Sequence, residues 1–236
     1  MPNAFLDVIL PPSCAGCARP GAVLCPACAA EFHDDPRPRW PSSPPPGLPD
    51  CWSAADYQGA PRRAILAYKE RGRTALARPL AACLVSTLVA ARASPAWPCG
   101  RDRPLVLVPV PSSRRAVRQR GHDPVGRLAA LAVRGLRARG WPIALAPVLE
   151  QRRRVRDQAG LSAAQRAANL AGAFGVRRAA QARQRAFWGR AEPVAALVDD
   201  IVTTGTTLAE AAGALRHAGV AVPLAITLAA TRRREG

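Results

Sequence analysis

Uninterrupted apolar runs along the chain predict the strands of a parallel sheet. Val194–Val198 and Leu105–Pro111 show no alternation with polar residues, which is typical of strands buried on both faces. Other apolar runs predict further strands at Cys51–Tyr57, Ile143–Leu149, Phe174–Val176 and Val222–Leu228. Strands of this kind require a covering layer on each face of the sheet.

Segments with helical periodicity separate these runs. Helices are predicted at Pro61–Glu70, Arg73–Arg92 and Pro124–Arg139, with Gly72 dividing the first two. A further helix follows Thr207, which has the spacing of a capping box to Glu210. Strands alternating with helices over 236 residues predict an α/β fold of one medium domain with a small appendage.

The character of the chain changes abruptly after Val198. Asp199 and Asp200 stand where the strand is expected to end, at a solvent-facing edge, and a Thr/Gly loop leads into the helix. Its members are Thr203, Thr204, Gly205, Thr206 and Thr207. Backbone N–H groups at a helix start and threonine hydroxyls can hold a phosphate, and the glycine lets the backbone approach closely. The carboxylates can accept hydrogen bonds from vicinal hydroxyls, so the stretch predicts a ribose 5-phosphate site at the carboxyl edge of the sheet. The alternative is an ordinary strand-to-helix turn with capping threonines.

Four cysteines near the N-terminus have the spacing of metal ligands. Cys14, Cys17, Cys25 and Cys28 form CxxC-x7-CxxC, which can direct four thiolates to one tetrahedral zinc ion. Because four cysteines leave no open coordination position, we expect a structural role for the metal. A redox pair and two disulfides are the alternatives. Cys51, Cys83 and Cys99 lack such spacing and are expected to be buried or incidental thiols.

A second polar loop follows the proline-terminated run Leu105–Pro111. Ser112, Ser113 and Arg114 can present hydroxyl, N–H and guanidinium donors to a diphosphate. His122 is better explained as a hydrogen-bonded or helix-start residue than as a catalytic one. Lys69 is the only lysine of the chain, and an exposed lysine at a helix end explains it at least as well as a functional role.

Composition adds a strong positive charge. The formal net charge is +18, carried almost entirely by arginine, which favours polyanionic partners such as nucleic acid or phosphorylated small molecules. A solvated, arginine-rich surface is the alternative. We find no export signal, and the longest apolar segment is too short to span a bilayer, so a cytoplasmic protein without a membrane span is expected.

Several segments together resemble the ComF family, in which a four-cysteine zinc ribbon is joined to a type I phosphoribosyltransferase domain. The stretch Asp199–Thr207 resembles that domain's motif for PRPP (5-phosphoribosyl-1-pyrophosphate). The other matching pieces are the four cysteines, Tyr57–Pro61, Tyr68–Gly72, Val108–Pro111, Arg118–Gly121 and Asp157–Leu161 with Arg166 and Asn169. The family usually has Asn-Gln where this chain has Asp123-Pro124, and a bulky residue where it has Ser112.

The resemblance implies a division of the chain and a role for each site residue. It implies a zinc ribbon at 1–33, a proline-rich linker at 34–50 and a phosphoribosyltransferase-like domain at 51–236. Asp199 and Asp200 would hold the ribose hydroxyls, the Thr/Gly loop would hold the 5-phosphate, and Ser112, Ser113 and Arg114 would bind pyrophosphate with Mg²⁺. Gln158 and Arg166 are typical positions of the family's mobile loop over PRPP.

The function implied is transfer of ribosyl phosphate from PRPP to a nitrogen nucleophile, a glycosyltransferase reaction linked to DNA uptake in natural competence. Two alternatives are a single-stranded-DNA-binding competence adaptor and a PRPP sensor without transferase activity. The expected partners are PRPP, single-stranded DNA and competence or DNA-processing proteins. No motif specifies the acceptor base.

Overall fold

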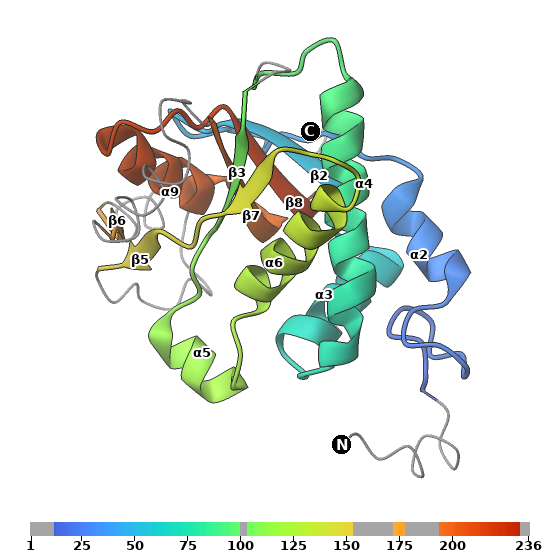
Figure 1. The fold of residues 1–236 in the computed structure, drawn as a ribbon. Helices are drawn as coiled ribbons and strands as arrows, with labels where there is room; N and C mark the ends of the chain where they lie inside the picture. The colour runs from blue at the N-terminus through green and yellow to red at the C-terminus, as the bar shows by residue number, and fades with distance from the viewer. Residues whose placement is uncertain (1–11, 100–102, 153–171, 178–193, 232–236) are drawn as a thin grey trace.

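A computed structural model describes residues 12–99, 103–152, 172–177 and 194–231, and it contains a mostly parallel six-stranded sheet. The strand order is β1 (Arg37–Pro38), β2 (Asp50–Asp56), β8 (Leu224–Ala230), β7 (Val194–Val202), β3 (Leu105–Pro109) and β4 (Ile143–Leu145). Only β1 runs antiparallel to its neighbour. Helices cover both faces (Figure 1), which confirms the predicted α/β class.

The two helical layers differ in size. One face is covered by α3 (Gly59–Lys69), α4 (Ala77–Ala93, preceded by the 3-10 turn Thr74–Leu76) and α6 (Pro124–Arg137), with α2 (Pro26–His33) beside them. The opposite face is covered by α9 (Thr206–His217) and a two-stranded antiparallel sheet of β5 (Leu149–Gln151) and β6 (Phe174–Val176). The short helix α5 (Arg114–Arg120) lies beyond the end of β3 in Figure 1.

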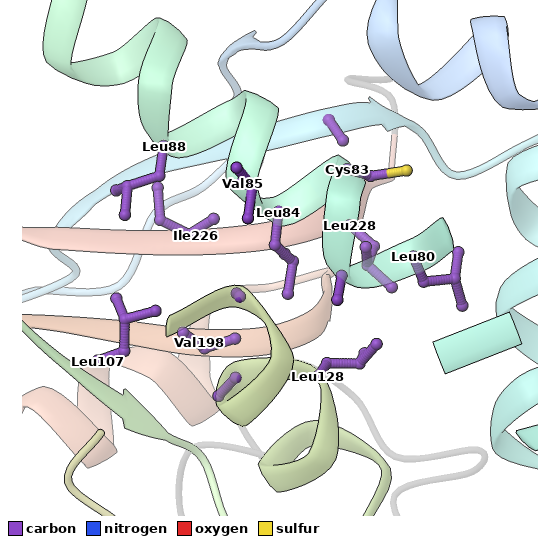
Figure 2. Packing of buried hydrophobic residues seen from close by; sticks show 14 of the residues in the cluster. Leu80, Cys83, Leu84, Val85, Leu88, Leu107, Leu128, Val198, Ile226 and Leu228 are labelled. Atoms are coloured by element: carbon purple, nitrogen blue, oxygen red, sulfur yellow. The ribbon is translucent and has the colours of Figure 1, made fainter. Parts of the chain in front are cut away.

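The central strands are apolar on both sides because each side meets one of these layers. Leu105 and Leu107 of β3 pack into the core beneath α4 and α6, whereas Val106 and Val108 pack into the core beneath α9. Figure 2 shows the larger core, in which successive turns of α4 bring Leu80, Leu84 and Leu88 against the sheet, along with residues of β7, β8 and α6. The uninterrupted apolar runs therefore predicted the buried strands correctly.

One predicted strand was wrong in its extent. Ile143–Leu149 forms not one strand but two, since β4 ends at Leu145 in the main sheet and β5 begins at Leu149 in the two-stranded sheet. Ala146 still donates its N–H to the carbonyl of Leu107, at 2.8 Å. Pro147 has no N–H to continue the ladder, so the chain leaves the sheet there.

The helix α4 is long and rich in apolar residues. With the preceding turn, Thr74–Ala93 is long and apolar enough to cross a membrane by length and composition alone, and 56% of its most apolar window is buried inside the protein. Because its leucines fill the core between α6 and the sheet, the packing of the domain accounts for its apolar character.

The proline-rich segment 34–50 packs against the sheet. Its residues Arg37 and Pro38 form the edge strand β1, and the buried Arg39 donates to Asp56 at 3.0 Å and to the carbonyl of Ser53 at 2.6 Å. The segment expected as a linker is therefore held to the domain by these contacts.

Candidate functional site

The four N-terminal cysteines come together as the sequence predicts. Their sulfur atoms all lie within 4.8 Å of one another, and Sγ of Cys17 and Cys25 are 3.6 Å apart. Four thiolates at Zn–S distances of about 2.3 Å would be separated by about 3.8 Å, so the cluster is close enough to bind one structural metal ion such as zinc. Cys25 caps α2 and Cys28 lies within it, with Pro26 at the first helical position.

Backbone geometry favours the thiolate form within this cluster. The N–H groups of Gly16 and Cys25 each donate to Sγ of Cys14 at 3.3 Å. Burial alone would raise the pKa of Cys14, but these N–H donors outweigh it and lower the pKa to about 6. Burial raises the pKa of Cys28 above its usual range, and a bound cation would reverse that effect. A side chain at Gly16 would lie 2.6 Å from Sγ of Cys28, so only glycine fits there.

The N-terminal segment that carries the four cysteines, residues 12–33, is called the cysteine module here. It is packed on the sheet domain through α3. Arg63 donates to the carbonyl of Gly16, Arg73 donates to the carbonyl of Ser13, and the N–H of Ala60 donates to Glu31 at 3.2 Å. A cleft of about 670 Å³ remains between the module and α3, where Arg71 joins these two arginines. No acidic side chain is among the described residues that line it.

Replacing Cys28 by Ser should abolish stoichiometric zinc binding, because the buried hydroxyl cannot replace the fourth thiolate. The wild type should carry one zinc ion per chain by elemental analysis, and Cys28→Ser should carry well under one. Cys51→Ser, at a buried cysteine outside the cluster, is the matched control and should retain the full zinc content. A wild-type protein prepared under reducing conditions that is folded but free of zinc would contradict the assignment.

The strand β7 runs past the acidic pair, contrary to the sequence prediction. Asp199 and Asp200 were expected at a solvent-facing strand end, but β7 continues to Val202 because β8 pairs with it as far as Ala230. Consequently Asp200 is only 5% exposed and Asp199 is half-buried. Burial raises the pKa of Asp199 well above its usual value, and the neighbouring charge of Asp200 adds to this effect.

The cation that faces this pair is Lys69, whose role the sequence left open. Its Nζ lies 2.5 Å from Oδ2 of Asp200, and its side chain is 28% exposed. Burial acts to lower the pKa of Lys69, but the charges of Asp200 and Asp199 act more strongly, so the net shift is upward. The one signal in the sequence was a single lysine in an arginine-rich chain, which is too weak to identify its partner.

The Thr/Gly loop forms a tight entry to α9. Gly205 is the N-cap residue, in the left-handed conformation with φ of 75°, and the helix begins at Thr206. The predicted capping box of Thr207 and Glu210 is therefore wrong, and Glu210 instead accepts from the N–H of Gly172 at 3.2 Å. Thr203 is exposed, Thr206 is buried, and the hydroxyls of Thr204 and Thr206 are 3.0 Å apart.

The underside of this loop is covered by the proline-rich segment. A Cβ atom at Gly205 would lie 2.9 Å from a methyl group of Leu48 and 3.2 Å from the ring of Pro41. The sequence predicts that another group approaches the backbone closely at Gly205. Among the described residues, Leu48 and Pro41 of the same chain make this close approach.

Replacing Gly205 by Ala should destabilise the protein more than the same change at Gly219. Both residues have positive φ, 75° and 78°, but a Cβ atom at Gly219 would meet nothing within 4 Å. The shared conformational cost is about 1–2 kcal/mol, and overpacking against Leu48 should add roughly 1–3 kcal/mol for Gly205→Ala alone. Urea unfolding of the zinc-loaded protein measures both. Adding Leu48→Ala to Gly205→Ala should restore part of the extra loss of unfolding free energy. Equal losses for Gly205→Ala and Gly219→Ala would show that the contact with Leu48 does not affect stability.

The loop after β3 is shorter than the sequence suggested. Ser112 and Ser113 are half-buried, but Arg114 already begins α5, and the hydroxyl of Ser113 accepts from the N–H of Ala116 at 3.1 Å as its cap. The helix was missed because its seven residues carry no apolar periodicity. Arg115 and Arg118 are exposed on it.

A set of contacts joins α3 to the segment between α5 and α6. Tyr68 donates its hydroxyl to the carbonyl of Pro124 at 2.9 Å, and Arg120 contacts both oxygens of Glu70 at 2.8 and 3.0 Å. His122 packs near the Tyr68 ring and forms a 3.0 Å contact through Nδ1 with the carbonyl of Arg120, so it is a hydrogen-bonded histidine, as expected. Asp123 accepts from the N–H of Gly126 and caps α6.

The two polar loops lie at the same edge of the sheet because of its topology. The strands β3 and β7 are parallel neighbours in register up to Pro109 and Val198, and the N–H of Val110 still donates to the carbonyl of Val198 at 2.9 Å. Beyond these residues β7 crosses to β8 through α9 on one face, whereas β3 crosses to β4 through α5 and α6 on the other. Such a divergence is a topological switch point, where open α/β sheets bind ligands. Gln158 and Arg166 lie outside the described residues.

In the comparison with known proteins, no family model matches the chain, and no curated protein matches it.

Proposed function

We propose that PRPP binds with Mg²⁺ at the carboxyl ends of β3 and β7, in the space where their chains diverge (called the crevice from here on), and that the protein is a phosphoribosyltransferase-like member of the ComF family. The observation that carries the proposal is the coincidence of three features at one topological switch point. They are the acidic pair, the Thr/Gly entry to α9 and the serine loop before α5. An ordinary strand-to-helix turn does not need an acidic pair, a Thr/Gly loop and a neighbouring serine loop at the same place.

The 5-phosphate fits the start of α9. The first-turn N–H groups of a helix lack intrahelical partners, and the helix dipole favours an anion there. The helix is twelve residues long, and the exposed Thr203 and half-buried Thr204 and Thr207 border its start. We therefore assign the phosphate to Thr203–Thr207.

The sugar and the diphosphate fit the two sides of the crevice. Asp199 and Asp200 would accept hydrogen bonds from the ribose hydroxyls and stabilise positive charge that develops on the sugar. Ser112, Ser113 and Arg114 would face the diphosphate, with Mg²⁺ neutralising the leaving group. In the transfer, the bond from the anomeric carbon to the pyrophosphate oxygen breaks, a bond to a nitrogen nucleophile forms, and that nitrogen loses a proton. No covalent enzyme nucleophile is needed.

Replacing Asp199 or Asp200 by Asn should weaken PRPP binding. Each substitution keeps the size of the side chain but removes a charged acceptor worth roughly 1.5–3 kcal/mol, so affinity should fall about one to two orders of magnitude per carboxylate. Titration calorimetry with PRPP and Mg²⁺ measures this effect. Asp200→Asn should also lower thermal stability, because it leaves Lys69 without its ion-pair partner.

The matched control is Asp50→Asn, which removes a half-buried carboxylate at the opposite, amino end of β2. It should leave PRPP affinity unchanged. If the wild type binds PRPP and the double Asn variant binds equally well, the acidic pair belongs to a turn and the assignment fails. Release of pyrophosphate in the presence of candidate nucleobases separates the transferase from a PRPP sensor.

A second candidate function is a single-stranded-DNA adaptor in competence, working with other DNA-processing proteins. The observation that favours it is the position of Arg115 and Arg118, which are exposed on α5 at the same edge of the sheet. The sequence has a second basic cluster, Arg152, Arg153, Arg154 and Arg156, of which only Arg152 is among the described residues. The low aromatic content, 5%, argues against extensive base stacking and for contact with phosphates.

Binding to single-stranded DNA should be weak, without strong sequence preference and steeply dependent on salt. The logarithm of the affinity should fall with that of the salt concentration by about 0.7 per phosphate contacted. Arg115→Ala combined with Arg118→Ala should reduce this slope by up to about 1.4, if each arginine contacts one phosphate. Arg134→Ala, at an exposed arginine in the last turn of α6, is the control and should leave the slope unchanged. An affinity that barely responds to salt would refute an electrostatic mode of binding.

A further inference from the structure

We propose that Lys69 is a positioning residue of the site between β3 and β7: its ammonium group holds Asp200 in place and favours the charged form of the acidic pair, which a sugar diol needs. This inference rests on the proposed function for its ligand, but its physical basis is the ligand-free geometry.

Lys69 is held in position by its two neighbours in the chain. It is the last residue of α3, and Tyr68, which precedes it, donates to the carbonyl of Pro124 at 2.9 Å. Glu70, which follows it, is paired with Arg120 at 2.8 Å. The two anchors are Arg120, the last residue of α5, and Pro124, the first residue of α6. The Lys69 backbone is therefore fixed on the α6 side of the sheet, and its side chain reaches β7.

The contact that it makes there is close and largely shielded from water. Nζ of Lys69 is 2.5 Å from Oδ2 of Asp200, an oxygen that is itself buried. Asp199 is fixed separately, because its Oδ1 accepts from the N–H of Asp200 at 2.8 Å. Each carboxylate therefore has one oxygen engaged by the protein, which limits its rotation before a ligand arrives.

The positive charge of Lys69 opposes the effects that raise the pKa of Asp199. Two adjacent carboxyl groups in a buried setting repel each other, and burial and the Asp200 charge raise the pKa of Asp199. Lys69 on α3 is the charge that acts in the opposite direction on Asp199. Arg120 on α5 acts on Lys69 but is itself paired with Glu70. Among the described residues, Asp200 also acts on Tyr68, together with Arg127 and Asp123 at the start of α6.

The consequence for ligand binding has a definite sign. A carboxylate accepts hydrogen bonds from hydroxyl groups best when it is ionised. Without Lys69, Asp199 would take up a proton at a higher pH than in the wild type, because the Lys69 charge lowers the pKa of Asp199. The loss of diol binding on acidification would then begin at higher pH.

The test uses the full zinc-loaded chain as wild type, Lys69→Met, Lys69→Gln and the charge-preserving Lys69→Arg. Arg78→Met, which removes one exposed positive charge on α4, is the matched control. Carbon-13 NMR of the aspartate carboxyl groups in the ligand-free protein follows the titration of the pair. Both neutral variants should titrate at higher pH than the wild type, and Lys69→Arg and Arg78→Met should match the wild type. Using two neutral variants keeps the test valid if one of them folds poorly.

Calorimetric titration of PRPP with Mg²⁺ across the same pH range completes the experiment. Affinity in the neutral variants should fall away at higher pH than in the wild type, in step with the NMR titration. An unchanged carboxyl titration in Lys69→Met and Lys69→Gln would overturn the proposal, as would a loss of affinity that is uniform across pH, which indicates direct contact between Lys69 and the ligand. If the wild type binds no PRPP at any pH, the proposed function fails, while the NMR arm still decides how Lys69 acts on the acidic pair.

Discussion

The arrangement of this protein depends on one topological constraint, the divergence of two neighbouring parallel strands. β3 and β7 are paired as far as Pro109 and Val198, and then their chains leave for opposite faces of the sheet. This separation opens the carboxyl edge at one point, with Ser112 and Ser113 on one side and Asp199 to Thr207 on the other. The apolar strands and their two covering layers fix that point rigidly, since both cores meet at β3 and β7.

The helix α3 connects this crevice to the cysteine module. Its first turn is bound to the module through Ala60 and Glu31, and its next turn through Arg63 and the carbonyl of Gly16. Its last turn carries Tyr68 and Lys69, which contact α6 and β7. A metal bound by the four cysteines would therefore stabilise the platform against which α3 is packed. In this way a structural zinc ion would stabilise the position of Lys69 at the site without contacting the ligand.

The sequence predicted those features that local patterns encode. Apolar runs located the buried strands, and the CxxC spacing located the cysteine cluster, because both are properties of a few consecutive residues. Contacts between distant segments were not predictable in this way. The pairing of Lys69 with Asp200, the extension of β7 through the acidic pair, and the cover of Leu48 over Gly205 all depend on how the sheet is assembled. Two local features were also missed: the short α5 has no apolar periodicity, and Pro147 divides a run that reads as one strand.

The central claim is that the crevice between β3 and β7 holds a phosphorylated ribose, and a crystal structure of the zinc-loaded protein with PRPP and Mg²⁺ tests it most directly. The account predicts the 5-phosphate at the start of α9 beside Thr203–Thr207 and the ribose hydroxyls at Asp199 and Asp200, with Lys69 still on Asp200. Two other clefts could hold the ligand instead. One lies between α3 and the cysteine module, beside Arg63 and Arg73, and the other lies between α9 and the two-stranded sheet of β5 and β6, beside Arg152 and Arg216. PRPP bound in either of these, with the crevice empty, would contradict the account.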